Sequence, residues 1–206
     1  MKPSFGCSIL SWIPPKWTPE GGLYAIQQTA AAGFDLLEIL LPPSMEFDAP
    51  TVKKQLKQHN LQATCALNLP PSAHIPTHPQ EALRLLKAAI DKAATLETHY
   101  IGGVLHSGIG VFSGKQRTAE EEDTLCAVWA EAAAYAAQSE ITLGIEPINR
   151  YETYMCTSAE EVLRFIERVG APNLALHLDT FHMCIEETSF YEPVVAAGNR
   201  LQHLHM

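Results

Sequence analysis

Three residues with metal-binding side chains, Glu146, Asp179 and His205, each follow an otherwise apolar run of this sequence. The separation is 33 residues from Glu146 to Asp179 and 26 residues from Asp179 to His205, in each case about one strand plus one helix. If the runs are neighbouring parallel strands, their ends lie about 4.8 Å apart at one edge of a sheet. Two carboxylates and an imidazole suit Mn²⁺, Co²⁺ or Mg²⁺. For each acid alone, a helix cap or an ion pair is the alternative. Because all three residues stand at equivalent strand ends, a metal site is favoured.

Five further polar residues are candidates for the same site. Glu38 ends another apolar run. It is expected to be either a buried acid of the site or a group hydrogen-bonded inside the rim of a barrel. Glu152 and His182 stand in the segments that follow Glu146 and Asp179, where they could reach a ligand or be ordinary loop residues. His177 and His203 precede Asp179 and His205 by two residues, so they share the same face of a strand. For these two histidines a packed core position is favoured over a supporting role at the metal.

Short apolar runs of strand type alternate with longer segments of helical period, which is the pattern of βα units around a parallel sheet. The alternation predicts an α/β fold, a (β/α)8 TIM barrel with about seven of its strands in this chain. An open, doubly wound sheet is the alternative, but Ser11 to Pro15 stand where such a fold would carry a glycine-rich phosphate loop. The predicted strands are Phe5 to Leu10, Leu36 to Leu41, Gln62 to Leu67, Tyr100 to Leu105, Ile141 to Glu146, Leu174 to Asp179 and Leu201 to His205.

Capping residues mark the predicted helix ends. Serine or threonine followed three residues later by glutamate predicts a capping box, proline predicts a first helical position, and glycine predicts a left-handed helix end. The signals are Thr18-Pro19, Gly33, Thr118 with Glu121, Ser158 with Glu161, and Gly170. Units of about 25 to 40 residues with no linker-like tract between them predict a single domain over residues 1–206.

The composition is that of a folded globular protein, with 47% hydrophobic and 18% charged residues among 206. The formal charge of −9 and the scattered Lys and Arg residues leave no basic stripe, so neither nucleic acid nor a membrane surface is an expected partner. The sequence shows no signal peptide and no run of about 18 apolar residues, which predicts a cytoplasmic protein. Five cysteines without metal-type spacing predict reduced core thiols. They are Cys7, Cys65, Cys126, Cys156 and Cys184.

Three motifs carry a resemblance to a known family. They are Gly144 to Glu152, Leu178 to Met183 with Ile185-Glu186-Glu187, and His203-Leu204-His205. In these motifs the chain resembles the ketose 3-epimerases, the D-tagatose and D-psicose 3-epimerase group of the xylose isomerase-like TIM barrel sugar isomerases and epimerases. The resemblance runs along the whole chain in order, and the middle motif is its most specific part.

The resemblance implies a metal-dependent isomerase that moves a proton at the carbon next to a ketose carbonyl through an enediolate. It implies that Glu146, Asp179 and His205 bind Mn²⁺ or Co²⁺, with Mg²⁺ as a further candidate, and that Glu146 is also one of two catalytic bases. Glu152 and His182 would contact the sugar. One base removes the proton and the other returns it from the opposite face, so the stereocentre inverts without a redox cofactor.

The chain departs from the family after the fourth predicted strand. The family has aromatic residues there that cover the sugar, whereas this chain has His106-Ser107-Gly108, so the identity of the sugar is not predicted. Trp12 and Trp17 could supply an aromatic wall from the first loop, and packing is the alternative for each. The predicted substrate-binding residues are Glu152, His182, Trp12, Glu38 and His106.

A second departure is that the sequence ends at Met206, directly after the seventh predicted strand. We expect the C-terminal unit to be missing, and with it an arginine and the glutamate that serves as fourth ligand and second base. One hypothesis is an epimerase or isomerase represented by an incomplete chain, and the other is a metal- or sugar-binding barrel without turnover. Aldose–ketose isomerase, hydroxypyruvate isomerase and inosose dehydratase activities stay open, and the negative charge disfavours the abasic-site endonucleases of the superfamily. A sugar is the expected partner, and a homo-oligomer stays open.

Overall fold

The computed structural model describes residues 4–206, and within them seven parallel strands form one sheet in the order β1-β2-β3-β4-β5-β6-β7. Each strand pairs with its neighbours in the sequence, which is the winding of a barrel, whereas a doubly wound sheet reverses its strand order partway. The predicted barrel architecture is confirmed and the doubly wound alternative is wrong. The strands are β1 (Gly6–Ser8), β2 (Leu36–Leu40), β3 (Gln62–Ala66), β4 (Tyr100–Gly102), β5 (Thr142–Ile145), β6 (Leu174–Asp179) and β7 (Leu201–His205).

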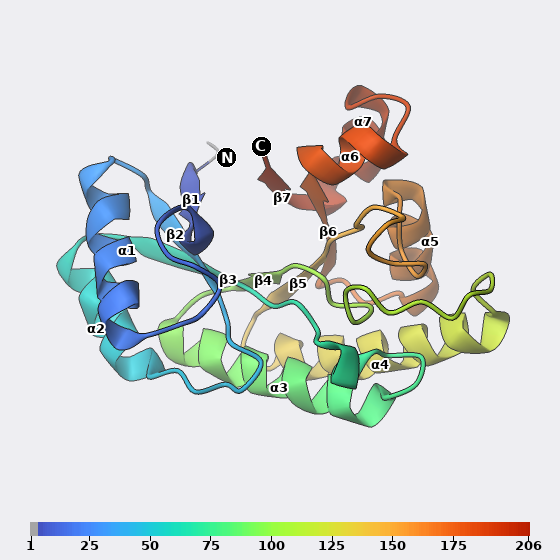
Figure 1. Ribbon diagram of the computed structural model, residues 1–206, viewed down its shortest axis with the longest axis horizontal. Coiled ribbons are helices and arrows are strands. Elements are labelled where there is room, and N and C mark those ends of the chain that lie inside the picture. The colour runs from blue at the N-terminus through green and yellow to red at the C-terminus, as the bar shows by residue number, and fades with distance from the viewer. Residues whose placement is uncertain (1–3) are drawn as a thin grey trace.

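Helices connect the strands and surround the curled sheet. They are α1 (Pro19–Ala31), α2 (Ala49–Gln58), α3 (Pro79–Leu96), α4 (Ala119–Ala137), α5 (Ala159–Val169), α6 (Thr180–Glu186) and α7 (Tyr191–Ala197), with the 3-10 turns η1 (Ile9–Ser11), η2 (Pro71–Ala73) and η3 (Gly198–Arg200). Figure 1 shows α1 to α5 on the outer side of the sheet. Among the helices of residues 4–206, none is both long enough and apolar enough to cross a membrane.

The predicted capping residues begin three of the helices. Thr18 accepts a hydrogen bond from a backbone N–H in the first turn of α1, and Thr118 with Glu121 forms a reciprocal capping box at α4. Ser158 caps α5, but the Glu161 carboxylate accepts from the backbone N–H of the residue before the cap. The predicted reciprocal box is therefore wrong at α5, because the Glu161 carboxylate is drawn outward into an ion pair.

Glycines with positive φ end two helices and one strand. Gly33 (φ 81°) and Gly170 (φ 72°) follow α1 and α5 in the left-handed conformation, as predicted. Gly103 has a φ of 110°, which breaks the extended backbone, so β4 ends at Gly102 rather than at the predicted Leu105. β1 is also shorter than predicted, because residues 9–11 turn into η1.

The hydrophobic core lies between the outer face of the sheet and the helices. Leu37 and Ile39 of β2 point into this layer and have no exposed surface. Trp129 of α4 and Phe165 of α5 pack edge to face with their ring centroids 6.2 Å apart, and both are almost fully buried. The Trp129 indole N–H donates to the carbonyl of Leu105 at 2.8 Å. This core therefore fixes the backbone that follows β4 as well as the helices themselves.

The inner face of the sheet carries polar rings that pack against glycines. Tyr100 of β4 lies across the interior with its ring stacked on that of His203, the centroids 5.2 Å apart. A Cβ on Gly144 of β5 would lie 1.9 Å from the Tyr100 hydroxyl oxygen, and a Cβ on Gly102 would lie 2.7 Å from His177 Nδ1. The two glycines therefore provide the space that the rings of Tyr100 and His177 occupy.

The five cysteines all lie within the described residues and all are free thiols, as predicted. Cys7, Cys65 and Cys156 are buried and Cys126 is half-buried. Cys184 is exposed on α6, so the prediction of a core position is wrong there. This short helix buries the adjacent Met183 and turns the next position toward solvent.

Gly144→Ala should lower the free energy of unfolding by about 1–3 kcal/mol, because the new methyl group overpacks the Tyr100 ring. Tyr100→Leu removes that ring, so the same substitution should cost at least ~0.5 kcal/mol less in the Tyr100→Leu background. Urea unfolding of the two single variants and the double variant measures both quantities. Equal costs of Gly144→Ala in the two backgrounds would contradict the proposed contact.

Candidate functional site

Glu146, Asp179 and His205 lie together at the carboxyl ends of β5, β6 and β7. His205 Nδ1 is 3.4 Å from Asp179 Oδ2 and 4.0 Å from Glu146 Oε1. Glu146 is buried, whereas the other two side chains are partly exposed. The fold therefore brings together the three residues that the sequence nominated, and their role as metal ligands stays a prediction.

A β-bulge in the pairing of β6 with β7 gives the two histidines of β7 their direction. Leu176 pairs with Leu201, but His177 pairs with His203 and Asp179 with His205, so one residue of β7 is extra. Because strand side chains alternate between the two faces, pairing without the extra residue would turn His203 toward the outside of the barrel. The bulge instead puts both histidines of β7 on the inner face, opposite His177 and Asp179.

Two of the neighbouring histidines have a ring nitrogen occupied by a backbone donor. The N–H of Gly103 donates to His177 Nδ1, and the N–H of Asn149 donates to His182 Nδ1, both at 3.2 Å. A neutral ring that accepts at Nδ1 carries its proton on Nε2, where it donates hydrogen bonds and offers no lone pair to a metal. His177, His203 and His205 lie close enough to share a cation, as do Glu146, Asp179 and His182. The backbone donors argue against His177 and His182 as ligands in either group.

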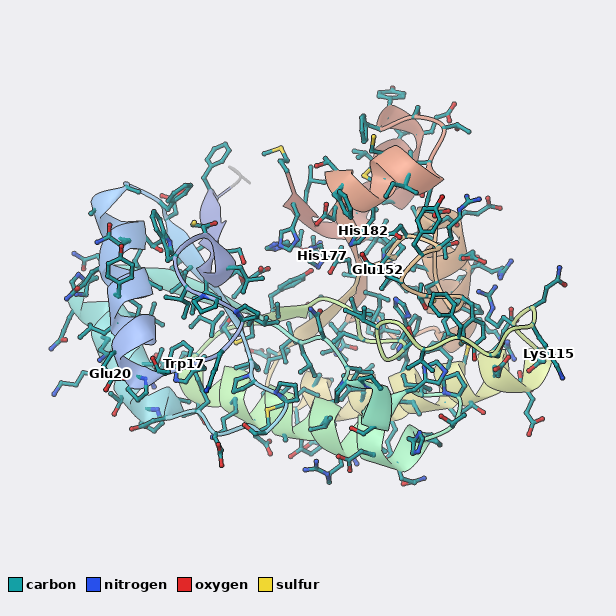
Figure 2. All side chains as sticks on the ribbon, in the orientation of Figure 1. Trp17, Glu20, Lys115, Glu152, His177 and His182 are labelled. Carbon is teal, nitrogen blue, oxygen red and sulfur yellow. The ribbon has the colours of Figure 1, made fainter. Side chains whose placement is uncertain are left out.

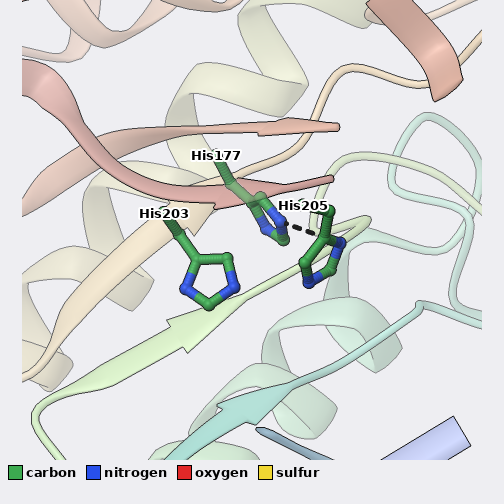
Figure 3. A group of neighbouring side chains, drawn as sticks. All are labelled: His177, His203 and His205. Atoms are coloured by element: carbon green, nitrogen blue, oxygen red, sulfur yellow. Dashed lines mark hydrogen bonds between the residues drawn. The ribbon is translucent and has the colours of Figure 1, made fainter. Parts of the chain in front are cut away.

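His205 lies between the other two histidines of the interior and a buried acid. Figure 3 shows the hydrogen bond between His177 and His205, in which His177 Nε2 is 3.3 Å from His205 Nδ1. Because His177 carries its proton on Nε2, this bond requires a lone pair on His205 Nδ1. His205 Nε2 faces both oxygens of Glu38, at 3.0 and 3.1 Å. Metal-bound histidines commonly donate their second N–H to a carboxylate in this way. His203 Nε2 is also 3.1 Å from Glu38, so Glu38 is a hydrogen-bonded acid of the interior, and its predicted contact with substrate stays a prediction.

The acids of the site crowd one another in a buried place. The pKa of Glu146 is raised to about 8, chiefly by burial; His205 opposes the rise, and Asp179, Glu38 and Glu152 add to it. Burial disfavours the charged form of His205, but its contacts with Asp179 and Glu38 outweigh burial and raise its pKa to about 10. Glu38 itself keeps a pKa well below its usual range despite its burial, because His203 and His205 donate to it.

The environment of His205 Nδ1 fits a divalent cation. The Asp179 and Glu146 carboxylates require positive charge beside this atom, whereas the His177 N–H requires a lone pair on it. A proton on Nδ1 meets the first requirement and violates the second. A cation on Nδ1 would neutralise the two carboxylates and would take the lone pair from the His177 N–H, and the mixed oxygen and nitrogen donor set suits Mn²⁺ or Co²⁺.

The predicted sugar-contacting residues Glu152 and His182 lie in the two segments that follow β5 and β6. Figure 2 shows the side chains of Glu152, His182 and His177 in one region of the interior. His182 Nε2 is 3.9 Å from Glu146 Oε1, and the Glu152 charge raises the pKa of Glu146. Arg150 and Glu186 form a two-pronged ion pair that joins these two segments. The pair therefore fixes the spacing between Glu152 and His182.

The remaining predicted contacts have partners inside the protein. The Trp12 indole N–H donates to Thr29 Oγ1 at 2.9 Å, which fixes its half-buried ring in the first loop. His106 is fully buried, and both of its ring nitrogens are hydrogen-bonded within the chain. Substrate contact by Trp12 and His106 stays a prediction. Trp17 packs against Phe47 and α1, well apart from His177 and His182 in Figure 2, so packing rather than an aromatic wall is its role.

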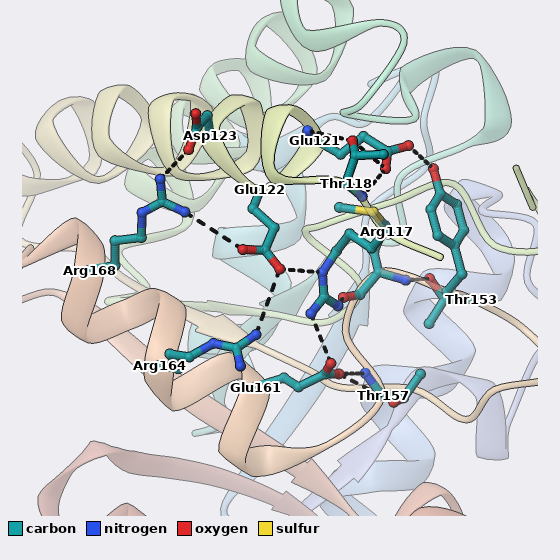
Figure 4. Close-up of polar contacts among 12 residues, drawn as sticks. Arg117, Thr118, Glu121, Glu122, Asp123, Thr153, Thr157, Glu161, Arg164 and Arg168 are labelled. Carbon is teal, nitrogen blue, oxygen red and sulfur yellow. Dashed lines mark hydrogen bonds and ion pairs between the residues drawn. The ribbon is translucent and has the colours of Figure 1, made fainter. Parts of the chain in front are cut away.

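An ion-pair network fastens the segment after β5 to the outer helices. Arg117 pairs with Glu122 of α4 and Glu161 of α5, both at 2.9 Å, and also donates to the carbonyl of Met155. Figure 4 shows this network extending to Arg164 and Arg168. Because the Arg117 side chain is only 11% exposed, these pairs are better shielded from solvent than ordinary surface salt bridges. The network therefore anchors the loop that carries Glu152 to helices α4 and α5.

Two residues that shape the site were not nominated from the sequence. Gly103 fixes the proton of His177 through its backbone N–H, and Asn149 fixes that of His182 through its backbone N–H and its side-chain amide, which is 3.0 Å from His182 Nδ1. Asn149 lies inside the first of the three motifs, between Glu146 and Glu152, and that position was the available signal. A backbone donor such as that of Gly103 leaves no signature in residue type.

Known proteins provide an independent comparison. Residues 26–206 match the family model described as xylose isomerase-like TIM barrel. The chain is 31% identical over 205 residues to a ketose 3-epimerase of Arthrobacter globiformis, an alignment that covers 98% of this chain and 70% of the relative. It is 32% identical over 206 residues to an L-ribulose 3-epimerase of Methylomonas sp., covering 98% and 71%. The structure of a D-allulose 3-epimerase from Methylomonas sp. in complex with D-allulose matches with a TM-score of 0.92 at 33% identity, covering 98% of this chain and 71% of that one.

Asp179→Asn and His205→Ala should each weaken Mn²⁺ binding by roughly 10-fold or more, since each change alters a proposed ligand. His182→Gln should leave the affinity within about threefold, because the Asn149 N–H already occupies the lone pair of His182. Isothermal titration calorimetry with Mn²⁺ compares the three variants. A loss in His182→Gln as large as that in His205→Ala would place His182 among the ligands.

The affinity for Mn²⁺ should increase with pH and binding should release protons. Glu146, with a pKa raised to about 8, holds a proton in the free site at neutral pH. It binds a metal only after losing that proton, so raising the pH from about 6 to about 8 removes part of the competition. Titrations in buffers of different ionisation enthalpy count the released protons. An affinity independent of pH over this range would rule out a protonated free site.

Proposed function

The chain belongs to the xylose isomerase-like TIM barrel family, with ketose 3-epimerases as relatives, and from that premise we propose that it epimerises an unphosphorylated ketose at the carbon next to the carbonyl. The observation that carries the proposal is the convergence of Glu146, Asp179 and His205 Nδ1 at the strand ends. These residues would hold a divalent cation, Mn²⁺ or Co²⁺. When bound, the ion would supply Lewis acidity that polarises the carbonyl and stabilises developing negative charge on oxygen.

Glu146 is the residue that we assign to proton removal. Its carboxylate is the most buried of the three proposed ligands, and its backbone continues directly from β5. Removal of the carbon-bound proton next to the carbonyl gives an enediolate, and inversion follows when a second acid on the opposite face of that carbon returns a proton. Holding the base on a strand end keeps the distance between carboxylate and carbon short, which is worth a large factor in rate.

His182 and Glu152 are the residues that we assign to the sugar hydroxyl and carbonyl oxygens. The Asn149 N–H keeps the His182 proton on Nε2, so His182 presents an N–H donor on the side that faces Glu146. Glu152 is an acceptor for a hydroxyl group. A donor and an acceptor on opposite segments would orient a ketose across Glu146.

The charges around the site favour a neutral sugar over a sugar phosphate. Three acids, Glu38, Glu152 and Asp179, lie close enough to a fourth, Glu146, to raise its pKa. The arginine of the loop after β5, Arg150, is already held by both oxygens of Glu186. A phosphate group would therefore meet net negative charge beside an arginine that is already paired. This is the reason for proposing an unphosphorylated substrate.

In D₂O with Mn²⁺, the protein should exchange the hydrogen on C3 of a ketohexose such as fructose, psicose or tagatose for deuterium. Glu146→Gln should reduce that exchange by about 100-fold or more, because general-base contributions are typically of that size. Proton NMR follows the loss of the C3 signal and the appearance of the 3-epimer in the same sample. Exchange reports the step assigned to Glu146 even when epimer formation is slow.

Glu167→Gln, an exposed change on the outer helix α5, is the matched control and should exchange like the unaltered protein. The 6-phosphate of the same ketohexose should exchange at least about tenfold more slowly, because of the acidic surroundings. Exchange that survives Glu146→Gln would remove Glu146 as the base. Metal affinity without any exchange in the unaltered protein would favour a binding function over an enzymatic one.

A further inference from the structure

A buried chain of hydrogen-bonded side chains leads from the loop after β5 to the backbone of Glu146. Thr153 Oγ1 is 2.9 Å from Ser107 Oγ, Ser107 Oγ is 2.9 Å from His106 Nδ1, and His106 Nε2 is 3.0 Å from the Glu146 carbonyl oxygen. The three side-chain residues are at most 1% exposed. None of them has a part in the proton removal proposed for Glu146.

The two ends of this chain fix the direction of every hydrogen bond in it. The Glu146 carbonyl can only accept, so His106 carries its proton on Nε2 and accepts at Nδ1. Ser107 must then donate to His106, which leaves Thr153 as the donor to Ser107. The backbone N–H of Met155, which can only donate, completes the series at 3.0 Å from Thr153 Oγ1. Every donor in the chain has an acceptor, and reversing one bond would leave a buried group unsatisfied.

The Glu146 backbone depends on this chain because it lies just beyond the sheet. β5 ends at Ile145, and the Glu146 N–H still donates to the carbonyl of Gly103 at 3.1 Å. His106 supplies the donor for the Glu146 carbonyl. With both backbone groups held, the direction of the Cα–Cβ bond is set, and this bond is the point from which the carboxylate extends into the site.

The same segment after β4 also holds the loop that carries Glu152. The Gly110 N–H donates to the Glu152 carbonyl at 2.8 Å, and Ser107 holds the hydroxyl of the adjacent Thr153. Residues 106–110 therefore contact the backbone of both acids that act on substrate in the proposed function. A shift in this segment would move both acids together.

We propose that His106, Ser107 and Thr153 are positioning residues that act as one unit, aiming the Glu146 carboxylate and coupling it to the loop that carries Glu152. The catalytic part of this inference rests on the proposed function, whereas the hydrogen-bond order does not. A merely structural role would lower stability and leave the chemistry of the folded protein unchanged. A positioning role lowers the rate of proton removal while substrate affinity changes little.

Thr153 offers a matched pair of variants. Thr153→Val keeps the shape but removes the hydroxyl, so Met155 loses its acceptor and Ser107 loses its donor. Thr153→Ser keeps the hydroxyl and removes a methyl group. In the C3 exchange assay, kcat should fall by roughly 10-fold or more in Thr153→Val, with KM within about threefold, because partners behind a catalytic group typically contribute that much. Thr153→Ser should stay within about threefold of the unaltered protein, although both variants lower the melting temperature.

Two measurements that do not need turnover accompany this comparison. Two-bond ¹H–¹⁵N spectra of histidine-labelled protein should show His106 as the neutral Nε2–H tautomer, and Ser107→Ala should disturb the His106 signals. Mn²⁺ affinity should fall by roughly 10-fold in Thr153→Val and not in Thr153→Ser.

An Nδ1–H tautomer of His106 would overturn the inference, as would equal kcat and equal Mn²⁺ affinity in folded Thr153→Val and Thr153→Ser. If the unaltered protein shows no exchange with any ketohexose, the proposed function fails. The tautomer and the Mn²⁺ affinities then still decide whether the chain of hydrogen bonds positions Glu146.

Discussion

Carboxylates from β2, β5 and β6 surround one imidazole, that of His205, and this concentration of negative charge in a buried place is the constraint that the rest of the site satisfies. Glu38 binds one ring nitrogen, and Asp179 and Glu146 lie beside the other. Burial makes each charge costly unless a partner is present. Histidines that donate hydrogen bonds to Glu38 offset part of this cost of burying charge. A divalent cation held by Asp179, Glu146 and His205 would offset the rest. The protonation of these acids is therefore coupled, and replacing any one of them would change the charge state of the others.

Backbone N–H groups decide what each histidine can do in this surrounding. Gly103 and Asn149 direct the protons of His177 and His182 to Nε2, so these rings donate, while His205 Nδ1 is left to face the acids. These donors are themselves fixed, because Gly103 ends β4 and Asn149 lies in the loop fastened by Arg117 and the Arg150 ion pair. The helices and ion pairs outside the barrel thus act on the chemistry inside it through the orientation of a few main-chain groups.

The sequence by itself determined the architecture and the meeting of the three proposed ligands. Apolar runs that recur with helical segments between them have one favourable burial pattern, a parallel sheet covered by helices, and β6 and β7 begin and end where the sequence predicted. Glu146, Asp179 and His205 each follow such a run, and in a parallel sheet the carboxyl ends of all strands meet at one edge. Periodicity and strand direction therefore suffice to place these residues together without any knowledge of side-chain contacts.

Only the tertiary structure decided which atoms of those residues face one another. The bulge in β7 turns His203 and His205 inward. The sequence around Gln202 does not predict this bulge, because a bulge depends on how two strands that are separate in the sequence align. Glu38 was left between two roles by the sequence and proved to bind His203 and His205 from across the barrel. His106 was nominated for the sugar, yet its hydrogen bonds lie within the chain. Hydrogen-bond direction is a property of partners brought together by folding, so residue type and spacing could not reveal it.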